Sequence, residues 1–154
     1  MEKEINEFLY QSNLIEGVDD DASLKQARVA WDYLVEQKEM SPSVILKTHK
    51  ILMLNQPLRP NERGYFREIP VYVGGRETLD WKVIEERMKI LAMNMWLNPK
   101  NWKRHHVEYE TIHPFVDGNG RTGRMFMNWE RLKEGLPILI INADERHEYY
   151  EWFK

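Results

Sequence analysis

The sequence predicts an all-α, mainly helical domain of six to seven helices with one small β-hairpin. Apolar residues recur at helical spacing in successive segments, and cap residues, glycines or prolines separate those segments. Only one stretch has the β-branched and aromatic composition of paired strands, and it surrounds the dipeptide Gly74–Gly75. With 154 residues and no repeat or linker, the chain is expected to form one domain over residues 1–154.

The first part of the chain predicts three helices. One runs from the N-terminus to Gly17, with Ile5 and Leu9 on its apolar face. Another begins at Ser41 and Pro42, a cap residue followed by a proline in the first turn, and runs to about Asn55. Between them, a helix that follows the acidic run DDDAS has one apolar face, formed by Leu24, Ala27, Trp31, Leu34 and Val35.

The second part predicts the hairpin and the remaining helices. The hairpin spans about residues 65–79, and Asp80 then caps a long helix that Pro99 ends, with Ile84, Met88, Leu91 and Met95 on its apolar face. A further helix covers about 101–112, and one last helix is expected within 143–154. The helix before Gly135 carries a stripe formed by Met125, Phe126, Trp129 and Leu132.

Composition and charge exclude several classes of protein. The net charge of −3 and the scattered basic residues disfavour a nucleic-acid partner. No run of 18 apolar residues is present, so no membrane partner is expected. The chain has no cysteine, and its acidic N-terminus lacks the apolar run of a secretion signal. We therefore expect a cytoplasmic protein.

Residues 113–124, HPFVDGNGRTGR, are too polar and too glycine-rich for a core segment. Gly118, Asn119 and Gly120 are expected at a helix N-terminus, where consecutive backbone N–H groups and the helix dipole form a cradle for an anion. Arg121 and Arg124 are three residues apart, so their guanidinium groups project from the same side of the helix. This arrangement predicts binding of more than one phosphate.

Two further residues predict chemistry at this cradle. Asp117 offers a carboxylate of the kind that binds Mg²⁺ when phosphates supply the other ligands, and His113 has a side chain suited to a general base near neutral pH. Each of these residues alone is also typical of a helix cap or a surface ion pair. Together they indicate metal-assisted transfer of a phosphate-containing group, without the spacing of a P-loop.

The stretch matches every position of the Fic motif, H-P-F-x-[DE]-G-N-G-R-x-x-R, and the chain thus resembles the Fic family. The resemblance implies a helical Fic fold and transfer of AMP from ATP to a Ser, Thr or Tyr hydroxyl of a target protein, with pyrophosphate leaving. It implies that His113 deprotonates the hydroxyl, that Asp117 holds Mg²⁺ or Mn²⁺, and that Phe115 anchors the loop in the core.

The same resemblance implies that Gly118, Asn119 and Gly120 cradle the phosphates, that Asn119 stabilises charge on the attacked phosphate, and that Arg121 and Arg124 hold the distal ones. Three alternatives stay open: removal of AMP, transfer of another phosphate-containing group, and nucleotide binding without turnover in a regulator. His113 and Asp117 argue against the last, because binding alone requires neither. The target protein is left open, with self-modification included.

A carboxylate lies on the apolar face of the first helix, since Ile5, Leu9, Ser12 and Glu16 follow one another at intervals of four, three and four. The segment SNLIEG resembles the inhibitory motif of the Fic family, [ST]-x-x-x-E-[GN], with Ser12, Glu16 and Gly17 at the defined positions. The resemblance implies that residues 1–18 form an inhibitory helix whose Glu16 pairs with Arg124 and prevents productive binding of ATP. The alternative is that Glu16 points away at a frayed helix end.

The hairpin and the C-terminal tyrosines also have two interpretations. Family resemblance implies that a flap, with Tyr65, Val71, Tyr72 and Val73, receives the target as an added strand, whereas a hairpin can also simply cover core residues. Tyr149 and Tyr150 lie about where relatives contact adenine, although packing is the more common role, and it is the role expected of His106 and Tyr109.

Overall fold

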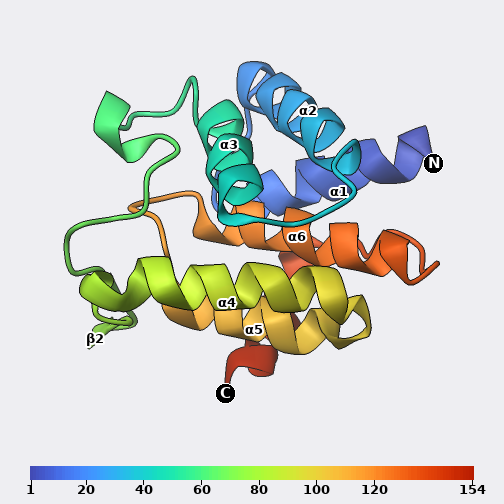
Figure 1. Cartoon of the computed structure of the whole chain (residues 1–154). Helices are drawn as coiled ribbons and strands as arrows, with labels where there is room; N and C mark the ends of the chain where they lie inside the picture. The colour runs from blue at the N-terminus through green and yellow to red at the C-terminus, as the bar shows by residue number, and fades with distance from the viewer.

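A computed structural model describes residues 1–154 and confirms the all-α class (Figure 1). Its helices and strands are α1 (Glu2–Ile15), α2 (Asp21–Val35), α3 (Pro42–Leu52), β1 (Tyr72–Val73), β2 (Arg76–Glu77), α4 (Ile84–Leu97), α5 (Trp102–Ile112), α6 (Asn119–Lys133) and α7 (Arg146–Tyr150). No helix is both long and apolar enough to cross a membrane.

Helix α6 runs through the middle of the molecule, with α1, α2 and α3 on one side and α4 and α5 on the other (Figure 1). Every residue from Arg121 to Glu130 is buried, so the single apolar stripe predicted for this helix is too narrow a description. The reason is that neighbouring helices cover α6 on all sides, and its polar side chains are therefore buried as well. Of these polar side chains, those of Arg121 and Arg124 belong to the site described below.

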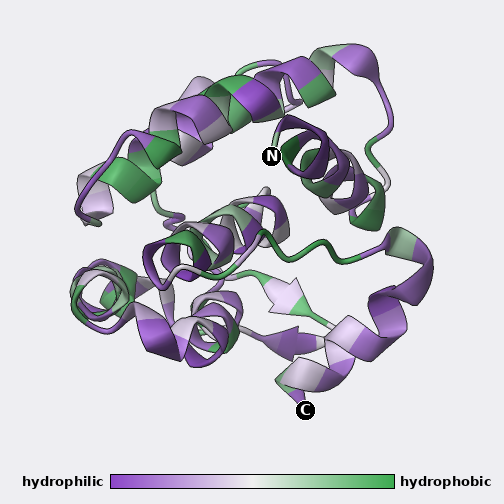
Figure 2. Cartoon of the chain, turned by 90° about the vertical axis from the view of Figure 1, so that its right-hand side faces the viewer, coloured by the Kyte–Doolittle hydropathy of each residue, from purple (hydrophilic) through white to green (hydrophobic).

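The core is formed by apolar side chains from six helices. It includes Phe8, Trp31, Ile45, Met88 and Phe126, and Figure 2 shows that apolar and polar residues alternate along the helices, as amphipathic packing requires. Val35 was predicted on the core face of α2 but is exposed, because it is the last residue of that helix.

Helix ends follow local capping chemistry. The hydroxyl of Ser41 accepts a hydrogen bond from the backbone N–H of Val44 and begins α3, which ends at Leu52, slightly before the predicted end. Asp80 caps a short 3₁₀ turn, Trp81–Val83, that leads into α4, instead of capping α4 directly. The predicted last helix is a short α7 between 3₁₀ turns at 143–145 and 151–153.

The hairpin is confirmed but is shorter than predicted. Val73 pairs with Arg76 and Tyr72 with Glu77, and Gly74 and Gly75 have φ values of 58° and 79° at the turn. A side chain would disfavour this left-handed backbone, which explains the two glycines. Tyr65 lies before the hairpin and does not belong to it.

Candidate active site

His113 lies at the end of α5 in a left-handed conformation, with φ 51° and ψ 64°. This conformation is unfavourable for a residue with a side chain, so the surroundings must hold it in place. Burial lowers the pKa of the half-buried imidazole below its ordinary value of 6.5, and its Nδ1 atom has no hydrogen-bond partner. His113 is therefore a neutral imidazole near pH 7, which is the form that accepts a proton.

The predicted anion cradle forms at the start of α6. Gly118 is the N-cap, with φ 88°, and Asn119, Gly120 and Arg121 make up the first turn, whose N–H groups have no acceptor within the helix. A Cβ at Gly118 would lie 2.8 Å from the sulfur of Met53, so both conformation and space require glycine there. The cradle has the geometry for binding a phosphate group.

The loop between His113 and the cradle is held by Phe115 and Asn119. Phe115 is completely buried, as expected of an anchor. The side-chain oxygen of Asn119 accepts a hydrogen bond from the N–H of Phe115, and its amide nitrogen donates one to the carbonyl oxygen of Phe115, both at 2.8 Å. The Asn119 side chain thus fixes the loop, and the backbone N–H of Asn119 is the group that it offers to the cradle.

Sequence reasoning missed His49, a buried residue of α3. Its ring stacks on Phe115 with centroids 3.7 Å apart, and its Nε2 donates a hydrogen bond of 2.8 Å to the carbonyl oxygen of Asp117. Its Nδ1 accepts from the N–H of Gly64, and burial lowers its pKa to about 4. His49 therefore positions the loop as a neutral ring, a role that no local pattern around residue 49 indicates.

Arg67 was missed for the same reason. This buried side chain donates hydrogen bonds to the carbonyl oxygens of His113 at 2.7 Å and Leu79 at 2.6 Å, and its backbone N–H donates to Pro114. Arg67 thereby ties the end of the hairpin segment to the loop that carries His113.

Arg124 is buried and only 2% exposed. It donates to the hydroxyl of Ser12 at 2.8 Å, to the carbonyl oxygen of Ser12 at 3.0 Å and to the hydroxyl of Tyr149 at 3.3 Å. It also forms an ion pair of 2.8 Å with Glu16. Gly17, with φ 72°, follows Glu16 and ends the helix. The alternative in which Glu16 points away is wrong in this structure.

Arg121 is equally buried, with 3% exposed. Its guanidinium contacts Gln56 at 3.2 Å and the carboxylate of Asp117 at 3.5 Å, and its Nε has no partner. The other oxygen of Asp117 accepts from the N–H of Gly118, and the side chain is 59% exposed. No group of three His, Cys, Asp or Glu side chains that could hold a metal ion is present. A divalent cation at the exposed carboxylate of Asp117 would therefore take its remaining ligands from a nucleotide and water.

Some of these groups border a cavity of about 650 Å³, whereas Arg121 and Asp117 do not line it. His113, Gly120, Glu16 and Arg124 lie along it. The hairpin forms one wall, which includes the predicted flap residue Val73, and Tyr149 and Tyr150 form another. Tyr149 is buried, and its hydroxyl lies 2.6 Å from Nε2 of His106, while the hydroxyl of Tyr109 lies 2.7 Å from that of Thr122. His106 and Tyr109 thus have packing roles, as predicted.

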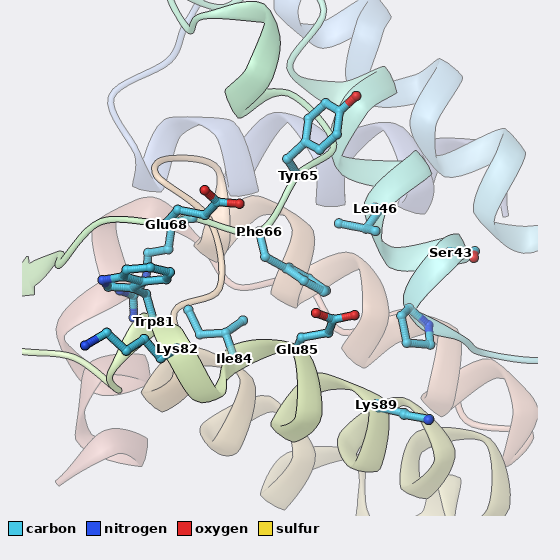
Figure 3. A pocket seen from close by; sticks show the side chains of 12 residues that line it. Ser43, Leu46, Tyr65, Phe66, Glu68, Trp81, Lys82, Ile84, Glu85 and Lys89 are labelled. Carbon is cyan, nitrogen blue, oxygen red and sulfur yellow. The ribbon is translucent and has the colours of Figure 1, made fainter.

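A second cavity, of about 630 Å³, lies between α3 and the start of α4 (Figure 3). Tyr65 borders this cavity and not the one with His113, together with Phe66, Leu46 and Ile84. The prediction that groups Tyr65 with the hairpin wall is therefore wrong in position. The predicted strand residue Tyr72 is 63% exposed.

Known proteins resemble this chain in sequence. Residues 39–130 match the model of the Fic/DOC family. Over 133 residues the chain is 34% identical to Protein adenylyltransferase Fic of Drosophila persimilis, covering 79% of this chain and 25% of the relative. The relative of the same name from Drosophila virilis is 35% identical, with 26% of its length covered. The chain thus spans about a quarter of the length of these curated relatives.

Solved structures share the fold. A Fic domain containing signaling protein from Bacteroides thetaiotaomicron has a TM-score of 0.84 at 19% identity, over 97% of this chain and 70% of that one. Fic-1 from C. elegans has a TM-score of 0.77 at 23% identity, over 98% of this chain and 55% of that one. The solved structures show that the fold is shared, and the match of the family model over residues 39–130, more than half of the chain, shows that the chain belongs to the Fic/DOC family.

Proposed function

We propose that this chain is a protein adenylyltransferase, which transfers AMP from ATP to a hydroxyl group of a protein. The observation that supports this most strongly is the cavity where the neutral imidazole of His113, Gly120 of the helix N-terminal cradle and the buried Arg124 meet. The name of the Drosophila relatives, protein adenylyltransferase, agrees with that chemistry.

In the proposed reaction, the hydroxyl of a Ser, Thr or Tyr gives its proton to His113 and its oxygen attacks the α-phosphate of ATP. The new bond joins that oxygen to the α-phosphorus, and the bond between this phosphorus and the pyrophosphate oxygen breaks. The N–H groups at the start of α6 stabilise the negative charge that develops, and Arg121 and Arg124 hold the distal phosphates.

We assign Mg²⁺ to Asp117, and Mn²⁺ suits the same oxygen ligands. A divalent cation supplies positive charge to the phosphates, which favours departure of pyrophosphate. The contribution of this chain is an exposed carboxylate whose backbone is fixed by His49 and whose inner oxygen is fixed by Gly118. Asp117 therefore requires little rearrangement to accept the ion.

Glu16 acts as an inhibitor in this proposal. Its carboxylate occupies the guanidinium of Arg124 that a distal phosphate of ATP needs, so carboxylate and phosphate compete for one cation. A Cβ at Gly120 would collide with Glu16 and Arg124, which shows how closely the carboxylate approaches the cradle. Productive binding of ATP then requires Glu16 to move away.

We assign the hairpin to the target protein. Val73 is exposed and borders the cavity, and each strand of a two-stranded sheet keeps one edge free for an added strand. The target hydroxyl would be presented toward His113 from that edge. The target is another protein or a second copy of this chain.

The experiment compares ATP labelled at the α-phosphate with ATP labelled at the γ-phosphate, using Glu16→Gly protein and a cell lysate. AMP transfer labels protein only from the α-phosphate, and the Glu16→Gly, His113→Ala double variant is the matched control. Label from the γ-phosphate alone would indicate transfer of another group, and loss of label from previously modified protein would indicate AMP removal. A folded Glu16→Gly protein that binds ATP and labels nothing would contradict the proposal.

A further inference from the structure

Glu110 is a buried carboxyl group that the proposed reaction does not use. It lies on α5, and its Oε1 is buried without any hydrogen-bond partner. A Cβ at Gly123 would lie 2.8 Å from this oxygen, so the carboxyl fills the space left by a glycine directly before Arg124. Glu110 also borders the cavity that contains Glu16 and Arg124. A buried polar atom left unpaired at such a place needs an explanation.

Two carboxyl groups therefore share the surroundings of one guanidinium. Glu16 forms the ion pair with Arg124, while Glu110 lies near enough to feel the charge of Arg124 but makes no ion pair with it. Burial raises the pKa of Glu110 to about 7, and the charge of Glu16 adds to this rise while that of Arg124 opposes it. With Glu16 in place, Glu110 therefore carries a proton below about pH 7.

The buried His106 and Tyr149, which lie near Glu110, cannot replace Glu16 as an anion. Burial lowers the pKa of His106 to about 3 and raises that of Tyr149, so both are neutral near pH 7. The remaining titratable neighbours are Tyr109 and His113 on α5 and, on the hairpin wall of the same cavity, Arg76 and Glu77. Glu77 is exposed on the hairpin, so Glu110 is, besides Glu16, the acid whose charge acts on Arg124.

We propose that Glu110 is a positioning residue for Arg124: after Glu16 moves away and before a phosphate takes its place, the carboxylate of Glu110 is the counter-ion that keeps the guanidinium facing the cradle. This inference rests on the proposed function in one respect, namely that Glu16 must move away before ATP can bind productively. A buried guanidinium without a counter-ion is strongly unfavourable, so Glu110 lowers the cost of releasing Glu16.

The proposal couples release of Glu16 to pH. When Glu16 is away, the unpaired charge of Arg124 lowers the pKa of Glu110, so the released state binds fewer protons than the restrained state. Raising the pH toward about 7 and above therefore favours release. In wild type, labelling should approach that of Glu16→Gly as the pH rises. When both proteins also carry Glu110→Gln, the ratio of their labelling rates should no longer depend on pH.

The decisive test is a double-mutant cycle on stability without nucleotide, at about pH 8 where an acid with this pKa is ionised. In wild type, Glu110→Gln removes a charge that burial and the neighbouring Glu16 make unfavourable, so it should raise Tm by about 2–4 °C. In Glu16→Gly, the same change removes the counter-ion of Arg124 and should lower Tm by about 2–4 °C. The sign of the effect is thus expected to reverse between the two backgrounds.

Glu108→Gln is the matched control, because Glu108 lies on the same helix, is partly exposed and lies 3.8 Å from Arg87. It should shift Tm equally in both backgrounds. Glu16→Gln provides a second background that keeps the length of the side chain, in case the glycine variant folds poorly. The cycle uses no ATP, so its outcome does not depend on whether the protein transfers AMP. Absence of AMP transfer would overturn the proposed function, while the role of Glu110 would still be decided by the cycle. An effect of Glu110→Gln with the same sign and size in all backgrounds would overturn the role of Glu110.

Discussion

The two arginines at the start of α6 have different partners and differ in how their charge is neutralised. Arg124 is saturated by Ser12, Glu16 and Tyr149, whereas Arg121 contacts Gln56 and a carboxylate at 3.5 Å and keeps an unpaired Nε. Both are almost completely buried. The difference therefore comes from the neighbours that other segments supply. In the proposed reaction, a phosphate would have to displace the carboxylate of Glu16 to reach Arg124, whereas Arg121 would offer it an incompletely paired guanidinium.

The largest expected effect comes from a residue other than the two arginines. His113→Ala removes the proposed base, so AMP transfer should fall by about 10²–10⁴-fold, as is typical for loss of general base catalysis. Both arginines keep their partners, and the affinity for ATP should stay unchanged in a calorimetric titration. Undiminished labelling by this variant would show that another group takes the proton.

The two arginines are best compared by removing the carboxylate beside each of them, Glu16 beside Arg124 and Asp117 beside Arg121. Glu16→Gly frees Arg124 and should raise labelling from α-labelled ATP by about tenfold or more, whereas Asp117→Asn removes the proposed metal ligand and should lower it by a similar factor. Both changes remove one negative charge near an arginine of α6, so each is the control for the other. Effects of the same sign would contradict the assignment, as would activity that persists in EDTA.

Stability should also distinguish the two arginines. Arg124→Ala deletes a fully paired buried cation, and a cost of about 3 kcal/mol is expected. Arg121→Ala removes weaker contacts, and a cost of about 1 kcal/mol is expected. Urea unfolding of both variants measures this difference, and equal costs would show that the extra partners of Arg124 contribute nothing.

His49 tests the loop from outside the motif. Its pKa of about 4 lies below the ordinary 6.5, so the unfolded chain takes up a proton that the folded protein resists, and stability falls as the pH drops from 6.5 to 4. The loss attributable to His49 should reach roughly 3 kcal/mol at the acid end. His49→Phe keeps an aromatic ring on Phe115 and should lack this loss. Parallel pH profiles for variant and wild type would contradict the assignment.

The smallest expected effect is on the pH dependence of the reaction. Burial lowers the pKa of His113 below 6.5, so the base stays deprotonated and active somewhat below that pH. In Glu16→Gly, kcat/KM should therefore begin to fall only below about pH 6.5. A midpoint above this value would indicate that the imidazole is not the group that titrates.

The sequence predicted the fold class, most helix bounds and the hairpin because these depend on local spacing and capping. It also predicted the cradle, because residues 117–124 are contiguous and a helix that begins at glycines fixes their relative positions. The pairing of Glu16 with Arg124 was expected from the resemblance of residues 12–17 to the inhibitory motif of the Fic family. The sequence could not predict how much of the surface of α6 is buried, since that depends on how many helices surround it.

What the sequence determined by itself is thus the chemistry contained in single segments: an imidazole, a carboxylate, a phosphate cradle and two arginines within twelve residues. Only the tertiary structure decided that His49 and Arg67 hold this loop, that the side chain of Asn119 is engaged with Phe115, and that Glu110 lies unpaired against Gly123. The spacing of residues along the backbone fixes distances only over a few residues. The hydrogen-bond partner that another helix supplies depends on how the helices pack, and on which polar atoms this packing removes from water.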